Sequence, residues 1–191
     1  MWKRWLIAVV GLVTITCGGG GGGSSGPTAP RTENIAGEWT GQYRVTSFSG
    51  GGCYGADLAA DLAQHPTAYD WAYTETITQT GSVISARRTM RYFLDHPGTV
   101  CEEDCLSCES SGSISGSTYT LTDDSCIGGE GDAPCWAEED IGIQRMVGGG
   151  QTGTVSGDTI SGTGEETIDI FKANGDPDGV LTTQYSYTQR R

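Results

Sequence analysis

Glu75 and Arg88 are the acidic and basic residues whose positions in this sequence point most directly to chemistry. They lie within residues 71–92, WAYTETITQTGSVISARRTMRY, where apolar and polar residues alternate on both sides of Gly81-Ser82. Glycine at the first position of a two-residue loop supplies the positive φ that a hairpin turn requires. With Gly81-Ser82 as the loop, Glu75 lies directly opposite Arg88 on the apolar face. Such a pair is either a structural ion pair or the polar anchor of a bound ligand.

The predicted register gives this hairpin an apolar face and a threonine face, as the two-residue period of a strand requires. A shift by one residue would mix the two faces, so the register is well specified. In the structural interpretation, neighbours such as Gln79 and Tyr73 satisfy the ion pair and the aromatic residues are core. In the functional interpretation, the aromatic residues leave a void that holds a ligand. The candidate ligand-binding residues are Glu75, Arg88, Tyr43, Trp71, Tyr73, Tyr92 and Tyr185.

Cysteines are the second group of residues whose spacing could indicate chemistry. Three of them, at 101, 105 and 108, have the spacing of the iron–sulfur ligands of radical-SAM enzymes, but those enzymes need a larger α/β barrel and a reducing compartment. An even number of cysteines in an exported chain predicts disulfides, here three, with a zinc site as the weaker alternative. Extending the next predicted hairpin favours a Cys108–Cys126 bridge and leaves Cys101 or Cys135 for Cys53. The predicted disulfide cysteines are Cys53, Cys101, Cys105, Cys108, Cys126 and Cys135.

The sequence contains no recognisable catalytic apparatus. The two histidines, His65 and His96, each precede a proline in a predicted loop, and no nucleophile is placed near them. Glu165 and Glu166 alternate between the faces of a strand and cannot flank one bond. Residues 174–179 resemble half of a calcium loop, but no helices flank them, so a polar turn is expected. We therefore predict no catalytic residue, no metal and no cofactor, with a hydrolase as the third alternative.

The first seventeen residues resemble a bacterial lipoprotein signal. A basic start, Lys3-Arg4, precedes an apolar stretch over 6–16 that is too short to span a bilayer, and Cys17 follows at once. The resemblance implies that residues 1–16 are removed and that Cys17 becomes the lipidated N-terminus. Gly18 after it implies the outer membrane of a bacterial envelope, facing the periplasm or the cell surface. The alternative is ordinary secretion with cleavage at another position. It stays open because residues 14–16, just before the cysteine, differ from the residues usual at a lipoprotein cleavage site.

Residues 17–34 are rich in glycine and serine and would form a flexible tether of a few tens of ångströms. Removing the signal lowers the basic residues from 11 to 9 against 24 acids, which changes the net charge from −13 to −15. Nucleic acid and anionic membrane surfaces are poor partners for so acidic a chain. The expected partners are the membrane, through the lipid anchor, and a small hydrophobic ligand, with the domain a monomer.

Alternating segments predict one all-β domain over 35–191. The first strand spans about 38–48, a short helix spans about 56–64 in the first loop, and the remaining strands bring the total to eight or nine. Residues 99–108 and 123–140 are expected to be acidic loops, and 141–156 either one glycine-bent strand or two. A sheet closed into an antiparallel up-and-down barrel removes its edges, with a β-sandwich as the alternative.

Gly37-Glu38-Trp39 stands at the head of the first predicted strand and resembles the Gly-x-Trp of lipocalins. The resemblance implies an eight-stranded barrel in which Trp39 is structural, closing one end beneath an arginine from the last strand, Arg190 or Arg191. It also implies a cup for a small apolar or amphipathic ligand. The alternative is a non-enzymatic envelope protein with a filled barrel. An open interior would favour the first and a packed one the second.

Overall fold

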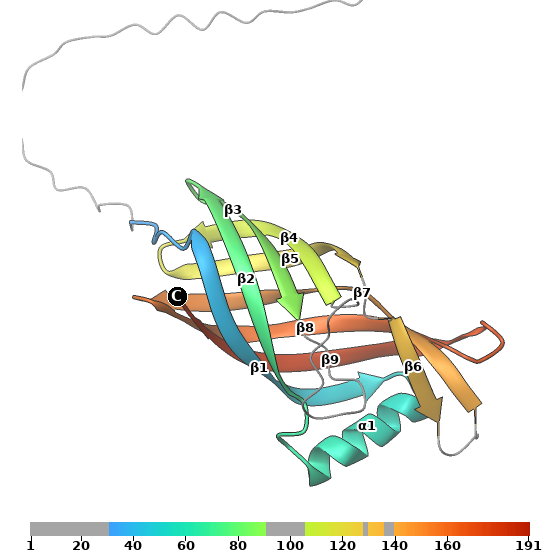
Figure 1. Ribbon diagram of the computed structural model, residues 1–191. Helices are drawn as coiled ribbons and strands as arrows, with labels where there is room; N and C mark the ends of the chain where they lie inside the picture. Colours follow the sequence, from blue (N-terminus) through green and yellow to red (C-terminus); the bar gives the residue numbers. More distant parts are fainter. Residues whose placement is uncertain (1–30, 91–105, 128–129, 136–139) are drawn as a thin grey trace, which may run out of the picture.

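The computed structural model describes residues 31–90, 106–127, 130–135 and 140–191, without the side chains of 106, 127, 130–135, 140 and 141. These residues form one antiparallel sheet and one helix (Figure 1). The elements are β1 (Gly37–Gly50), α1 (Gly52–Gln64), β2 (Asp70–Thr80), β3 (Val83–Met90), β4 (Leu106–Ser115), β5 (Thr118–Ile127), β6 (Glu130–Cys135), β7 (Asp140–Ser156), β8 (Thr159–Phe171) and β9 (Pro177–Arg190).

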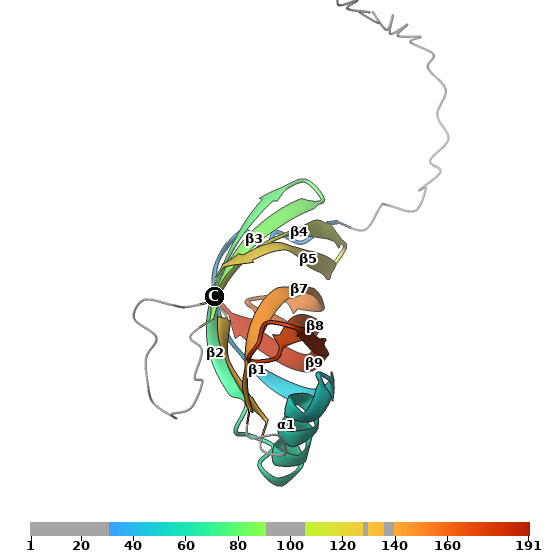
Figure 2. The ribbon, with the colours of Figure 1, turned by 90° about the vertical axis from the view of Figure 1, so that its right-hand side faces the viewer.

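The sheet closes into the predicted up-and-down barrel, and the sandwich alternative does not form. Its strands follow the order β5-β4-β3-β2-β1-β9-β8-β7-β6, and a further pairing between β5 and β7 closes the ring. Eight strands therefore make the barrel, and Figure 2 shows how they curve around its interior. The closing seam pairs residues 118–122 of β5 with 150–154 of β7, while β6 pairs with the first part of β7.

Three hairpins set the register as the sequence predicts. Gly81, Gly116 and Gly157 begin the turns after β2, β4 and β7, with φ of 63°, 60° and 61°. In the β2–β3 hairpin, Glu75 faces Arg88 across the two strands. The partner predicted for Trp71, Tyr92, lies outside the described residues.

The helix begins earlier than the sequence analysis expected, at Gly52 rather than near residue 56. Gly50, Gly51 and Gly52 all have positive φ, so the glycine run turns the chain from β1 straight into α1. Tyr54 is buried in the first turn of the helix, against an apolar cluster with β8 and β9. The helix ends at Gln64, before His65-Pro66, as expected. No described helix is long and apolar enough to cross a membrane.

Residues 123–140 are not the loop that was expected. β5 continues to Ile127, and β6 occupies 130–135. The prediction was wrong because glycines and acidic residues are typical of loops. In a barrel, an acidic side chain on a strand can also point inwards. β7 is one strand across its three central glycines, with a register irregularity between Met146 and Gly148.

β1 begins and β9 ends at the same end of the barrel (Figure 1), and Trp39 lies there, near the start of β1. Its side chain is 1% exposed, and its Nε1 donates a 2.9 Å hydrogen bond to the Ile35 carbonyl. The Arg191 guanidinium lies over its ring, 5.0 Å from the centroid. The arginine that the resemblance implied is therefore Arg191. The Gln79 side chain accepts a hydrogen bond from the Ile35 amide at 2.8 Å and ties the tether's end to the barrel.

Candidate functional site

Three acidic side chains and one arginine lie inside the described part of the barrel, where their strands alternate inwards. Glu75 of β2 is 1% exposed, Arg88 of β3 is 2% exposed and Glu166 of β8 is fully buried. The Asp123 side chain of β5 is 1% exposed. Among the described residues, these three carboxylates share the interior with one guanidinium. Burial of charge is costly unless each group is paired and hydrogen-bonded, so their contacts decide what this cluster does.

Arg88 bonds across the barrel rather than along its own hairpin. Its Nη2 lies 2.9 Å from Asp123 Oδ2, and its Nη1 donates to Gln151 at 3.1 Å and to the Tyr185 hydroxyl at 2.9 Å. Ser110 donates a 2.6 Å hydrogen bond to the other Asp123 oxygen. The predicted register is confirmed, but the residue that pairs with Arg88 is Asp123.

Glu75 is held by two amides. Gln151 Nε2 donates to its Oε1 at 2.9 Å, and Gln189 Nε2 donates to its Oε2 at 3.0 Å. Gln79, which was expected to satisfy the pair, bonds the chain near Ile35 instead. Burial raises the pKa of Glu75, against the opposing effects of Arg88 and the two amides.

Glu166 is the least satisfied member of the cluster. Its Oε1 lies 3.9 Å from Arg88 Nη2, and neither oxygen is in hydrogen-bond geometry with a described donor. The nearby Tyr43 hydroxyl nonetheless favours its charged form. Burial raises the pKa of Glu166 to about 7, with Arg88 opposing the shift and Asp123 adding to it. A carboxyl with this pKa exchanges its proton near neutral pH.

The aromatic candidates are inside, but they pack against one another. Tyr43, Trp71, Tyr73 and Tyr185 are all buried. The Tyr43 ring centroid lies 4.8 Å from that of Tyr185 and 5.1 Å from that of Trp71. These are ordinary distances for packed aromatic pairs. The predicted inner face is therefore confirmed for these four residues, and it forms core; Tyr92 lies outside the described residues.

Glycines on the inner face make room for these rings. A Cβ added at Gly164 would lie 2.3 Å from the Tyr185 ring, and one at Gly153 would lie 2.3 Å from the Tyr187 hydroxyl. At Gly41, it would lie 2.8 Å from Tyr73. Each inner glycine of this set thus faces a tyrosine from another strand, and the side chains of the barrel occupy its own interior. The sequence signal was available, because Gly41, Gly153 and Gly164 stand at inward positions of the alternating pattern.

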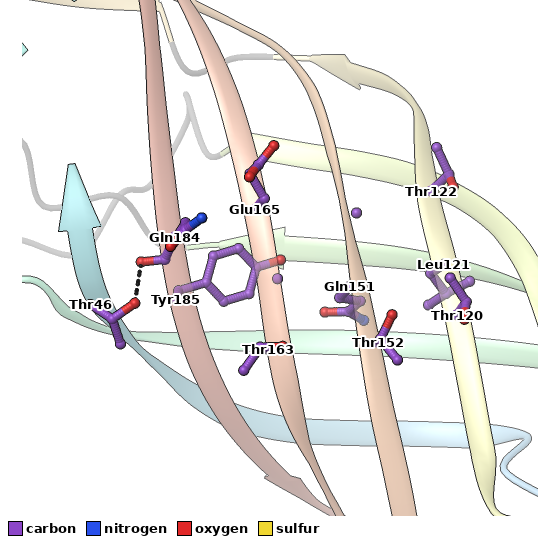
Figure 3. Close-up of a pocket in the computed structure, with 12 residues that line it drawn as sticks. Thr46, Thr120, Leu121, Thr122, Gln151, Thr152, Thr163, Glu165, Gln184 and Tyr185 are labelled. Carbon is purple, nitrogen blue, oxygen red and sulfur yellow. Dashed lines mark hydrogen bonds between the residues drawn. The ribbon is translucent and has the colours of Figure 1, made fainter. Parts of the chain in front are cut away.

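Two depressions among the described residues lie on the outer face of the barrel, with volumes of about 540 and 520 Å³. Figure 3 shows the first, which crosses β1, β9, β8, β7 and β5. Tyr185 and Gln151 form part of its floor, and outward hydroxyl, amide and carboxylate groups surround it. These outward side chains are Thr46, Thr120, Thr122, Thr152, Thr163, Glu165 and Gln184.

Cys108 and Cys126 form the predicted disulfide across β4 and β5. A register irregularity at Glu109 and Ser110 places the two cysteines directly opposite each other, where extrapolation had put Cys108 one residue away. Cys53 is also disulfide-bonded. Asp123 lies near the two sulfurs, but the thiols are oxidised and the carboxylate bonds Arg88, so this trio offers no thiolate to a metal. Cys17, Cys101, Cys105 and the side chain of Cys135 lie outside the described part.

His65 is the one histidine in the described ranges. Its Nδ1 lies 3.0 Å from Asp61, one turn earlier on α1, and Asp61 also accepts a 2.9 Å hydrogen bond from the Tyr69 hydroxyl. The imidazole is 63% exposed on the surface of the helix. His96 lies outside the described residues. The Tyr69 hydroxyl bonds Asp61 and not the His65 imidazole. These three residues therefore do not form a catalytic triad, in which the hydroxyl nucleophile bonds the imidazole and the imidazole bonds the acid.

The fold and interior define a closed antiparallel barrel whose core contains a buried charge cluster. Comparison with known proteins finds no family model that matches the sequence and no curated protein that does.

Proposed function

We propose that this chain is an exported, lipid-anchored envelope protein whose barrel is filled by its own side chains and which acts through its surfaces rather than by catalysis. The observation that carries the proposal is the fit of the inner glycines to tyrosine rings, as at Gly164 and Tyr185. A barrel that holds a ligand needs a void among such residues. The outer depression of Figure 3, lined by hydroxyl and amide groups, is a suitable surface for a polar partner.

The lipid anchor is proposed from the resemblance of residues 1–17 to a bacterial lipoprotein signal. It would place Cys17 in the outer membrane, with the barrel facing the periplasm or the cell surface. The described chain enters the barrel beside Trp39, at the end of β1 far from α1 (Figure 1). Replacing Cys17 by alanine should move the protein from the detergent phase to the aqueous phase in detergent partitioning. Retention in the detergent phase would contradict lipidation at this residue.

Binding of a small apolar or amphipathic molecule is the second candidate. The buried Arg88 cluster favours it, because titratable groups with shifted pKa values gather at binding sites. In that case, Glu75 and Arg88 would be the polar anchor, and Tyr43, Trp71, Tyr73, Tyr92 and Tyr185 the walls. The packed rings would then have to separate to admit the ligand.

Native mass spectrometry distinguishes the two candidates. The chain from Gly18 onwards would be exported through a cleavable signal, so that it is oxidised but not lipidated, and then offered fatty acids and hydrophobic dyes. Three disulfides would lower its mass by six hydrogens, one for each cysteine after Cys17. The filled barrel predicts this mass with no adduct. A stoichiometric adduct that the Glu75→Gln, Arg88→Met double variant loses would overturn it in favour of the ligand cup.

A further inference from the structure

The buried cluster contains more acid than base, and the excess falls on Glu166. Arg88 forms its short ion pair with Asp123, at 2.9 Å, whereas its distance to Glu166 is 3.9 Å. Glu75 has its two amide donors. A fully buried carboxylate without comparable donors is costly by several kcal/mol, and such a group neutralises itself by taking up a proton.

Thr183 of β9 is a second buried polar residue at this position of the sheet. It lies directly opposite Glu166 in the β8–β9 pairing, and its side chain is 1% exposed. Its hydroxyl oxygen and both Glu166 oxygens lack a described partner in hydrogen-bond geometry, so the two side chains do not bond each other in this conformation. Directly opposed side chains in an antiparallel pair have Cβ atoms about 4.5–5.5 Å apart. The Thr183 hydroxyl can accept a hydrogen bond from a protonated Glu166 carboxyl or donate one to the carboxylate, so it does not by itself decide the charge of Glu166.

We propose that the barrel interior is a proton-binding site, in which Glu166 takes up a proton and loses it when the surroundings become alkaline. In this step an O–H bond forms on the carboxylate as a hydronium ion gives up its proton, and in the reverse step the proton returns to water. The role is independent of whether the barrel binds a ligand or a partner. It makes the stability of the closed barrel depend on pH.

The titratable and charged groups that interact with Glu166 come from four strands. They are Tyr43 of β1, Arg88 of β3, Asp123 of β5 and Tyr185 of β9. Arg88 is the one cation among them, and it favours the charged carboxylate. Asp123 opposes ionisation of Glu166. With three carboxylates to one guanidinium, the neutral form of Glu166 removes one unit of buried repulsion.

The sign of the pH effect follows from linkage. The pKa of Glu166 is raised from its ordinary 4.5 to about 7 in the folded protein. The folded state therefore binds more protons than the unfolded state between these values. The stabilisation is complete below about pH 4.5, falls as the pH rises and is lost above about pH 7. The unfolding constant should rise on the order of 50-fold between pH 5 and pH 8 from this group alone.

The test compares Glu166→Gln with the wild type and with Glu165→Gln. Glutamine keeps the shape of a protonated carboxyl and cannot ionise, while Glu165 is the exposed neighbour on the opposite face. Urea unfolding of the oxidised chain from Gly18 onwards would be measured from pH 5 to pH 8. The ratio of the wild-type unfolding constant to that of Glu166→Gln should rise on the order of 50-fold. For Glu165→Gln, the corresponding ratio should stay constant. A constant ratio for Glu166→Gln would overturn the proposal.

Carbon NMR of wild-type glutamate carboxyls gives a second readout that does not depend on a variant folding. One buried carboxyl should titrate close to pH 7. If all of the glutamates titrate below about pH 5.5, Glu166 is ionised in the folded barrel and the proposal is wrong. Stabilisation of the wild type at pH 8 by added Ca²⁺, absent in Glu166→Gln, would instead assign the site to a metal cation and would also overturn it.

Discussion

The guanidinium of Arg88 on β3 pairs with the carboxylate of Asp123 on β5, at 2.9 Å, although Glu75 is its direct neighbour across the β2–β3 hairpin. The β3 side chain thus reaches past β4 to the strand that closes the barrel. Ser110 of β4 bonds the same carboxylate, so the contact links three consecutive strands. Asp123 lies one residue after the five-residue seam between β5 and β7. The pair therefore supports the barrel at the place where its ring closes.

Replacing Arg88 by methionine should destabilise the protein by about 3–5 kcal/mol, because it leaves buried carboxylates without their cation. The free energy of unfolding would be measured by urea denaturation at neutral pH. Arg87→Met is the matched control, since the Arg87 side chain is 65% exposed on the outer face beside Glu109. Its effect should stay within about 0.5 kcal/mol. Equal losses for the two variants would contradict a stabilising role for the buried cluster.

Gly164→Ala should cost about 1–3 kcal/mol, because the new methyl group would enter the space of the Tyr185 ring. A double-mutant cycle with Tyr185→Val checks the cause. If the two residues share one space, the double variant should lose clearly less stability than the sum of the single losses. Additive losses would mean that the glycine does not serve to accommodate the ring.

Removal of the Cys108–Cys126 disulfide by replacing both cysteines with serine should lower stability by roughly 3 kcal/mol, the value expected for a closed loop of this length. The expected readout is a lower urea midpoint with the other disulfides intact, checked by mass. The slope of unfolding against urea should rise, because the unfolded chain without this cross-link exposes more surface. An unchanged midpoint would show that the β4–β5 hairpin alone provides this constraint.

Arg191→Ala should lower stability by about 1 kcal/mol and change the fluorescence of Trp39, whose ring the guanidinium covers at 5.0 Å. Arg191 also bonds Asp158 at the β7–β8 turn. Arg190→Ala is the control, because Arg190 is exposed and its pairing in the sheet uses the backbone. If both variants have the same stability and fluorescence as the wild type, Arg191 does not secure the closed end.

The sequence by itself determined most of the strands, the register of the β2–β3 hairpin and one disulfide. Alternation and a glycine turn placed Glu75 opposite Arg88, and both are found so, because register in a hairpin is a local property. The same reasoning predicted the Cys108–Cys126 bridge. The N-terminal signal and the lipidation of Cys17 remain predictions from the sequence. The start of α1 was missed because three glycines in succession look like an interruption rather than the turn that begins the helix.

Only the tertiary structure decided which side chains meet inside the barrel. Arg88 and Asp123 are 35 residues apart in the sequence. Glu166 comes from β8, later in the chain, and lies near Arg88 only because the barrel closes. Their contact depends on strand curvature and on a register irregularity in β4–β5, neither of which appears in a local pattern. The same holds for Tyr185 in the space above Gly164. Barrel closure converts separate amphipathic strands into one shared interior, and it is there that the buried charges acquire their partners.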